Sequence, residues 1–295
     1  MISDCSHLAN PLASPGQLET SASQIDGLPQ DLEDVVRYQT FRLTQVAGIL
    51  LRLPQEIIAQ SIVILQRFLI GTSEGSLLQH DAIDIAAAAL FLTAKPSATP
   101  VSSRSVLTVC ECLLATGVTF DSSMVDIGAL DLEWYMSEGT YEARRSRLYA
   151  LEAAILRKLG FRTHCALPHA LCINYLQTMD AFRTTEGPSL AVRAFKYLNT
   201  ALLSPQLLYL THQPPVLATA SIYLAAKEVG AKLPEVEWWE VFDVDREELG
   251  FLVVALQSVE NFAAARKDQW NGRKVPLTAD ELQSMAEDRQ TDHFA

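Results

Sequence analysis

The segment HCALPHALC holds the closest grouping of potential metal ligands in the chain: His164, Cys165, His169 and Cys172. Imidazole and thiolate groups bind Zn²⁺ in tetrahedral sites. At these spacings, on or near a helix, the four side chains do not converge on one tetrahedral point, and the sequence has no second CxxC or HxxxH pair to complete a site. We therefore predict no metal site and no cofactor.

Catalytic motifs are also sparse. Neither GxGxxG nor GxxxxGK[ST] occurs, so nothing favours a phosphate-binding loop, and we expect no nucleophile elbow. Asp84, inside an apolar stretch, leaves two interpretations open: a buried acid with a raised pKa, or a helix-end cap or interhelical hydrogen bond. We predict no catalytic residue, no small-molecule substrate and no enzymatic activity of the chain itself.

The composition favours a protein partner over nucleic acid. The 295 residues include 35 acidic and 23 basic side chains, a net charge of −12, whereas binding a phosphate backbone depends on many lysines and arginines that release counterions. Hydrophobic residues make up 49% of the chain, which is enough for a sizeable core and excludes global disorder. We expect no direct contact with nucleic acid.

The cysteines and the N-terminal sequence indicate a reducing compartment. The 5 cysteines are odd in number and show no CxxC spacing, so they are most simply buried, reduced thiols. The N-terminus lacks a basic patch followed by an apolar stretch. The longest charge-free apolar run, 85–94, is shorter than the roughly 20 residues that a membrane-spanning helix needs. We expect a soluble, intracellular protein that does not enter a membrane.

Apolar residues recur at steps of three and four along most of the chain, which is the period of amphipathic helices. Gly160 stands where one of these stripes should end. Long alternating strand patterns are missing, so the sequence predicts an all-α fold. The clearest stripes are within 55–70, 106–114, 148–159, 192–202 and 249–259.

One helix in each half of the chain is apolar on every face. IAAAALFLTAK, 85–95, is rich in alanine, as a helix enclosed by other helices at close range must be. At an offset of 132 residues, 218–227 matches 86–95 with five of ten positions identical, including Lys227 for Lys95. We interpret the chain as two copies of one helical unit.

These features divide the chain into four parts. Residues 1–33 are rich in Ser, Pro, Gly, Gln and Asp and contain no Lys or Arg, so they are predicted to form a disordered tail. The helical units span 34–163 and 164–265, and 266–295 is a C-terminal tail or short helix. Basic residues concentrate in 144–162, which is most simply a solvated helix face.

The repeat and its motifs resemble the cyclin family, whose members have two tandem cyclin boxes of about five helices each. The resemblance covers about 32–262, and within it 48–68 and 168–179 look most like cyclin L and its transcription-type relatives. The most specific motifs are ALFLTAK ending at Lys95, LEAAILRKLGF at 151–161 and PPVLATASIYLAAK at 214–227.

The resemblance implies a regulatory subunit that binds a cyclin-dependent Ser/Thr protein kinase as a heterodimer and activates it. Likeness to cyclin L implies a kinase of RNA polymerase II transcription or pre-mRNA processing, and a location that is nuclear, or nuclear and cytoplasmic. Cyclin boxes are also similar to the core of TFIIB and to the retinoblastoma pocket. A TFIIB-like scaffold and a degenerate cyclin that activates no kinase therefore stay open.

The resemblance also implies the partner-binding residues. In cyclins a lysine at the end of the central helix of box 1 and a glutamate on the fifth helix hold the regulatory helix of the kinase, and Lys95 and Glu152 match these positions. Leu156 and Phe161 match positions that supply apolar contacts. A lysine suits the negative end of a helix and a carboxylate accepts from backbone N–H groups. The alternative is a mutual salt bridge, and Lys227 is expected to be structural.

Three features depart from the family pattern. Pro96-Ser97-Ala98 stands where most cyclins have a hydrophobic residue and two glutamates, and Pro96 should end the helix at once. The segment 116–138 is an insertion, either a passive loop or one that tunes partner choice. The Arg-Ser-rich tail of animal cyclin L is absent from the sequence, which puts any splicing role of such a tail in doubt.

Overall fold

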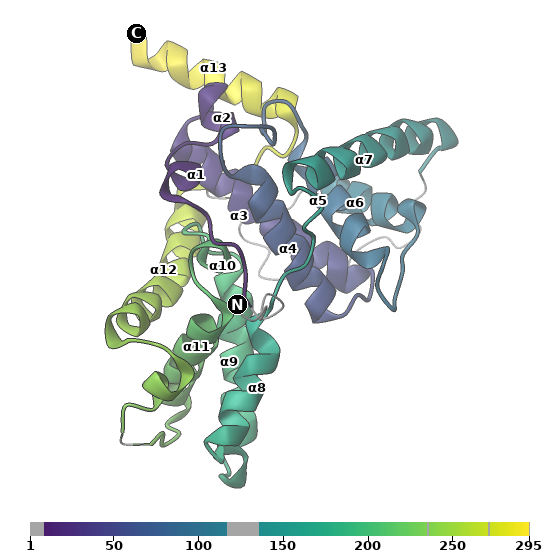
Figure 1. Ribbon diagram of the computed structural model, residues 1–295. Coiled ribbons are helices and arrows are strands. Elements are labelled where there is room, and N and C mark those ends of the chain that lie inside the picture. Colours follow the sequence, from purple (N-terminus) through teal and green to yellow (C-terminus); the bar gives the residue numbers. More distant parts are fainter. Residues whose placement is uncertain (1–8, 117–135, 235, 271, 295) are drawn as a thin grey trace. The chain divides into compact units, whose positions relative to one another are not determined.

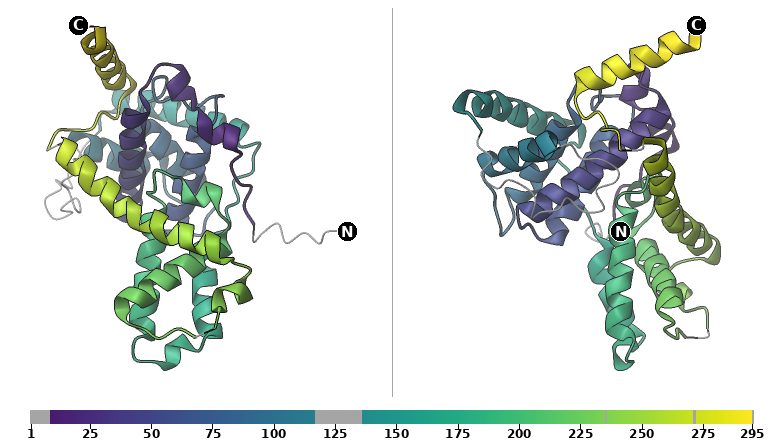
Figure 2. Two further views of the ribbon diagram at one scale, coloured as in Figure 1. Left: turned by 90° about the vertical axis from the view of Figure 1, so that its left-hand side faces the viewer. Right: turned by 180° about the vertical axis from the view of Figure 1, so that it is seen from behind.

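The computed structural model describes residues 9–116, 136–234, 236–270 and 272–294. Within these ranges every regular element is a helix, as both views in Figure 2 show, so the predicted all-α class is confirmed. The elements in Figure 1 are α1 (Pro15–Glu19), α2 (Ala22–Ile25), α3 (Gln30–Leu50), α4 (Gln55–Leu69), α5 (Ala82–Ala94), α6 (Ser103–Thr116), α7 (Glu138–Lys158), α8 (Pro168–Thr178), η1 (Ala181–Arg183), α9 (Gly187–Ala201), α10 (Leu208–Thr211), α11 (Pro214–Val229), η2 (Trp238–Phe242), α12 (Arg246–Trp270) and α13 (Ala279–Phe294).

The described chain divides into two compact units. The first unit contains 13–163 and 264–295, and the second contains 164–263 together with residues up to Leu12. The division between Thr163 and His164 coincides with the boundary drawn from the sequence. Helices α3 to α7 form a set of five in the first unit, and α8 to α12 form the repeated set.

Helix α5 is the centre of the first unit. All 13 of its residues are buried, and it contacts α3, α4, α6 and α7. The alanines at 86–89 let these neighbours approach closely because their side chains are small. The Ser61 and Thr93 hydroxyls are 2.6 Å apart and join α4 to α5, which satisfies two polar groups inside the core.

Helix α11 has the matching place in the second unit. It contacts α8, α9 and α10, and its alanine-rich stretch from Leu217 to Ile222 is buried. It ends at Gly230, whose φ of 75° gives the left-handed C-cap that glycine favours. The first copy ends differently, because Pro96 directly after Lys95 stops α5 as the sequence predicts.

Residues 9–33 differ from the predicted disordered tail. Helices α1 and α2 lie in this segment, and α3 begins at Gln30. Within the second unit Asn10 is buried, and its side-chain amide donates to the Ala166 carbonyl at 2.8 Å. The Gln213 amide donates in turn to the Asn10 carbonyl at 2.9 Å. These bonds give the N-terminal residues defined partners on a folded unit.

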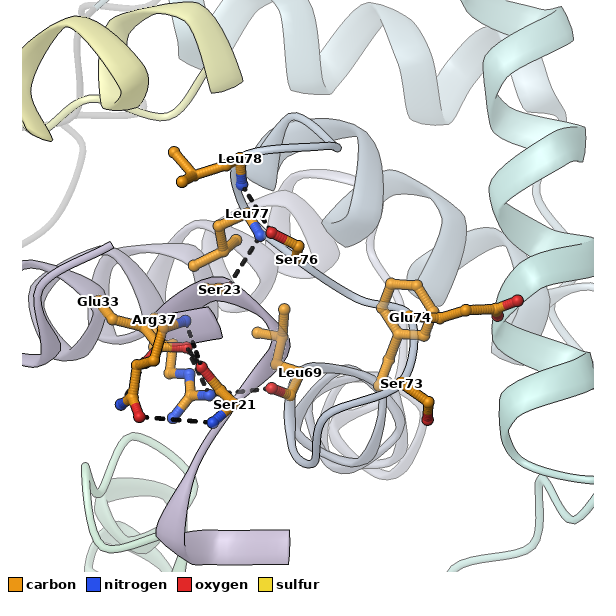
Figure 3. Close-up of polar contacts among 12 residues, drawn as sticks. Ser21, Ser23, Glu33, Arg37, Leu69, Ser73, Glu74, Ser76, Leu77 and Leu78 are labelled. Carbon is orange, nitrogen blue, oxygen red and sulfur yellow. Dashed lines mark hydrogen bonds and ion pairs between the residues drawn. The ribbon is translucent and has the colours of Figure 1, made fainter. Parts of the chain in front are cut away.

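A buried carboxylate fastens α2 to α3 in the first unit (Figure 3). Glu33 is fully buried, and its oxygens accept from Ser21 Oγ at 2.7 Å and from Gln24 Nε2 at 2.8 Å. Arg37 Nη2 lies 2.7 Å from the same carboxylate and donates to the Leu69 carbonyl at 2.9 Å. The polar residues that suggested disorder therefore satisfy buried groups of the fold.

The C-terminal segment is also more ordered than the predicted tail or short helix. Val275 and Leu277 are buried, and the 16 residues of α13 follow them. The Ala82 N–H donates to the Leu277 carbonyl, and the Ala279 N–H donates to Asp81 Oδ1, both at 2.9 Å. These bonds attach the start of α13 to the N-terminal end of α5.

Helix α12 has 25 residues and, within the described ranges, is long and apolar enough by length and composition to cross a membrane. The sequence-based expectation considered charge-free runs alone, and α12 carries charged residues such as Glu260. Core helices of soluble proteins meet the same criteria.

Replacing Glu33 tests the attachment of the N-terminal segment. We expect Glu33→Ala to lower the free energy of unfolding by about 3 kcal/mol, because it leaves Arg37 in a site with 12% side-chain exposure and no counter-charge. Urea denaturation followed by circular dichroism measures this. Asp31→Ala removes the exposed ion pair with Arg289 and should cost less than about 1 kcal/mol. Equal losses in the two variants would contradict the role assigned to Glu33.

Candidate functional site

Lys95 lies at the C-terminal end of α5, where the helix reaches solvent. Its side chain is 57% exposed, and it follows a helix with no exposed residue of its own. The ammonium is favoured at this end because the helix dipole is negative there. Lys95 Nζ also lies 5.4 Å from the centroid of the Phe91 ring, one turn earlier.

Helix α7 brings Glu152 to Lys95. Lys95 Nζ donates to Glu152 Oε1 at 3.0 Å, and the glutamate side chain is 10% exposed. The two residues are 57 positions apart, so their contact depends on how α7 packs on α5. The pair forms the mutual salt bridge that the sequence left open as an alternative. An ammonium group has three donors, so this bond leaves donor capacity for a partner's carbonyl groups.

A second set of ion pairs holds α7 near the other end of α5. Arg144 Nη1 lies 2.8 Å from Asp84 Oδ1, and Arg144 Nε lies 2.5 Å from Glu111 Oε1, so one guanidinium joins α5, α6 and α7. Burial raises the pKa of Asp84, and the charge of Arg144 opposes that shift. Asp84 is therefore both a buried acid and an interhelical partner, and its role is structural.

The two apolar candidates continue along α7 and past its end. Leu156 is four residues after Glu152, on the same face of the helix, and is partly exposed. The Phe161 N–H donates to the Leu156 carbonyl at 2.9 Å. Phe161 has a φ of 61° and is 72% exposed. A bulky residue held in the left-handed region with its ring in solvent suits a contact with another molecule.

Sequence reasoning missed two residues beside the pair. Tyr149 lies one turn before Glu152, and its ring centroid is 5.9 Å from that of Phe91. Hydrogen bonds from Arg145 and Ser103 lower the pKa of the Tyr149 phenol, and the Lys95 charge adds a smaller effect in the same direction. The sequence did contain a relevant feature, because an arginine and a tyrosine four residues apart share one face of a helix.

The expectation of no nucleophile motif needs a correction. Residues 71–75, Gly-Thr-Ser-Glu-Gly, match GxSxG. A nucleophile elbow requires a strand before the turn, whereas this match follows helix α4. Its backbone is structural, because Lys158 Nζ donates to the carbonyls of Phe68 at 2.7 Å and Ser73 at 2.5 Å, and to that of Glu74. The motif is a helix-terminating loop and not an active site.

The histidine and cysteine side chains of 164–172 have other roles than metal binding. Burial raises the pKa of Cys172 to about 12, which disfavours the thiolate that a metal needs. His169 Nε2 lies 3.1 Å from Asn199 Oδ1, and its ring meets Phe195 edge-on at 5.3 Å. Within the described ranges, no group of three or more His, Cys, Asp or Glu is arranged to hold a metal ion.

Curated relatives match most of the chain. Cyclin-L1-1 of Arabidopsis thaliana is 30% identical over 79% of this chain and 52% of the relative. Cyclin-L2 of Mus musculus is 30% identical over 82% of this chain and 43% of the relative. A cyclin-L1-like protein of Schizosaccharomyces pombe is 29% identical over 72% of this chain and 78% of the relative. The chain belongs to the cyclin family. It spans about half the length of the first curated relatives it matches, 45% to 52%. No family model matches it.

Solved structures share the fold of this cyclin. A chain of the crystal structure titled as the yeast RNA Pol II CTD kinase CTDK-1 complex matches with a TM-score of 0.63 and 14% identity, over 96% of this chain and 84% of that chain. A chain of the CAK complex from Chaetomium thermophilum bound to ATP-gamma-S matches with a TM-score of 0.56 and 14% identity, over 95% and 91%. The predicted pair of tandem cyclin boxes fits these neighbours.

The family pattern therefore has a definite geometry in this cyclin. Lys95 and Glu152 meet at one end of α5, and Leu156 and Phe161 continue the surface. Pro96 stands directly after Lys95, so the acidic pair of most cyclins has no counterpart there. Of the inserted segment 116–138, residues 117–135 lie outside the described residues.

A double-mutant cycle tests the balance of charge in the pair. We expect Lys95→Met to cost about 2 kcal/mol of stability, because it leaves the nearly buried Glu152 carboxylate without its counter-charge. Glu152→Gln should cost less than about 1 kcal/mol, because the exposed ammonium stays hydrated. Urea unfolding of both variants and of the double variant measures the coupling. Additive effects would show that the two groups do not interact.

Proposed function

We propose that this cyclin is the regulatory subunit of a cyclin-dependent Ser/Thr protein kinase, binds it as a heterodimer and activates it without catalytic residues of its own. The observation that carries the proposal is the Lys95–Glu152 pair, which occupies the two family positions and joins them at 3.0 Å at the exposed end of α5. The titles of the two solved structures name kinase complexes, which supports a kinase as the class of partner.

The chemistry of the pair suits one turn of a partner helix. Lys95 donates to carbonyl groups of the partner, Glu152 accepts from its N–H groups, and the side chains of Leu156 and Phe161 supply apolar area. These contacts favour the kinase state in which the regulatory helix is swung inward, so binding shifts the population toward that state. The helix glutamate then pairs with the ATP-orienting lysine, and phosphoryl transfer to a protein hydroxyl takes place wholly on the kinase.

The relatives named cyclin-L and the CTD kinase neighbour support a role in RNA polymerase II transcription or pre-mRNA processing. RNA polymerase II and splicing factors are the substrate class in this proposal. The proposed location is nuclear, or nuclear and cytoplasmic. The cyclin itself would need no nucleic acid, membrane or small-molecule substrate.

Two alternatives give different outcomes. A TFIIB-like scaffold would need a basic surface over both repeats, and the net charge of −12 argues against it. A degenerate cyclin would bind a kinase without raising its activity, and the loss of the acidic pair after Lys95 is the feature that favours it. Measuring association and activity separately distinguishes the three.

Charge reversal at the pair tests the proposal directly. We expect Lys95→Glu and Glu152→Lys each to weaken kinase association by about 2–5 kcal/mol or more, because each places a like charge against the partner's helix. The tagged chain would be purified from its source organism, the bound kinase identified by mass spectrometry, and its activity assayed on an RNA polymerase II C-terminal-domain peptide. Active kinase at wild-type yield with both variants would refute the site.

Two controls separate binding from folding. The swapped variant Lys95→Glu with Glu152→Lys restores a salt bridge within the cyclin and should fold normally, yet it presents reversed charges and should not bind. Lys227→Glu changes the repeat counterpart, an exposed lysine in α11, and should bind as the wild type does. Loss of binding with Lys227→Glu would show a general charge effect instead.

A further inference from the structure

Four side chains extend the surface of α7 away from the Lys95–Glu152 pair, and the proposed function does not use them. The guanidinium carbon of Arg104, from α6, lies 4.0 Å from the centroid of the Tyr141 ring. The guanidinium carbon of Arg145 lies 6.0 Å from the same ring and 5.6 Å from the Tyr149 ring. We call Arg104, Tyr141, Arg145 and Tyr149 the arginine–tyrosine ladder.

The ladder is continuous with the kinase-binding residues. The Tyr149 and Phe91 rings are 5.9 Å apart, and Phe91 in turn lies under Lys95 Nζ at 5.4 Å. Arg145, Tyr149, Glu152 and Leu156 follow one another at steps of four, three and four, so they share one face of α7. At a rise of 1.5 Å per residue, this face is about 16 Å long. One end of it is cationic and aromatic, and the other is apolar.

The ladder offers hydrogen-bond donors to solvent. The side chains of Arg104 and Arg145 are 47% and 42% exposed, and Tyr149 is 41% exposed. Each arginine has an exposed glutamate beside it, Glu138 at 2.7 Å and Glu142 at 3.0 Å. Exposed ion pairs of this kind stabilise a fold very little. A carboxylate from another molecule can therefore replace either glutamate at small cost.

Resting on the function proposed above, we propose that the arginine–tyrosine ladder is a second contact region for the kinase and binds a carboxylate-bearing segment next to the helix held at Lys95 and Glu152. A guanidinium group binds a carboxylate through two parallel hydrogen bonds, and a phenol hydroxyl donates a third. The lowered pKa of Tyr149 agrees with this, because its neighbours Arg145 and Lys95 are both cationic. The ladder thus selects partners by the charge of the residues adjoining the bound helix.

RNA is the competing ligand, because bases stack on aromatic rings and on arginine. A phosphate chain requires an extended basic groove, whereas Glu138 and Glu142 flank the ladder and the whole chain has a net charge of −12. A single carboxylate needs only the local cations. The charges around the ladder therefore favour an acidic protein segment.

Arg145→Ala and Tyr149→Ala test this proposal. The probe is the kinase that co-purifies with the wild-type cyclin, measured by surface plasmon resonance between about 50 and 300 mM salt. We expect each variant to weaken binding by about tenfold at low salt, and Arg145→Ala to flatten the salt dependence. Tyr149→Phe should retain part of the affinity, because the ring stays and the hydroxyl is lost. Circular dichroism checks that each variant is folded.

Arg147→Ala is the matched control. Arg147 is two residues from Arg145 on the opposite side of α7, with 62% side-chain exposure near Asp81 and Asp84, and its loss should change affinity less than about twofold. Wild-type affinity in Arg145→Ala overturns the ladder's role while the proposed function stands. Equal losses in Arg145→Ala and Arg147→Ala also overturn it. A labelled oligouridine that binds wild type and not Arg145→Ala assigns the ladder to RNA. A wild type that binds no kinase overturns both proposals.

Discussion

A helix buried on every side can carry charge only at its two ends, and α5 follows this constraint. Its N-terminal end has Asp81 and Asp84, which the helix dipole favours, and its C-terminal end has Lys95. Both ends pair with α7, through Arg144 at the first and Glu152 at the second. Two ion pairs of opposite direction therefore fix how α7 lies against α5, and they fix where the exposed face of α7 points.

The two ion pairs differ in burial, and this difference separates anchoring from binding. Arg144 and Asp84 have side-chain exposures of 16% and 8%, and breaking such a pair leaves an uncompensated buried charge, which costs about 3–5 kcal/mol. Lys95 is more than half exposed, so its contact with Glu152 can be exchanged for a partner's groups at much lower cost. The anchor keeps α7 in position while the exposed pair changes partners.

The sequence predicts α5 almost completely, because an alanine-rich apolar stretch between an aspartate and Lys95-Pro96 has one plausible structure. It cannot predict that Glu152 lies 3.0 Å from Lys95, since 57 intervening residues leave the distance undetermined, and the family resemblance supplied that expectation. Composition obscured the N-terminal helices. Ser21 and Gln24 form a capping box that the S-x-x-Q pattern contains, but averaging over 1–33 reads the same residues as disorder.

The residues after Lys95 and the residues before Glu152 bear on the same question of charge. Most cyclins place two glutamates after the lysine, which gives that surface a negative edge. Here Pro96-Ser97-Ala98 removes those charges, and on α7 Arg145 and Tyr149 lie on the face that leads to the same lysine. The balance at this end of α5 therefore moves toward the positive. A partner suited to the usual edge would bring a cation to it, whereas a partner suited to this one would bring a carboxylate. Departure from the family motif and the added cations thus point to one change in specificity, and neither requires loss of binding.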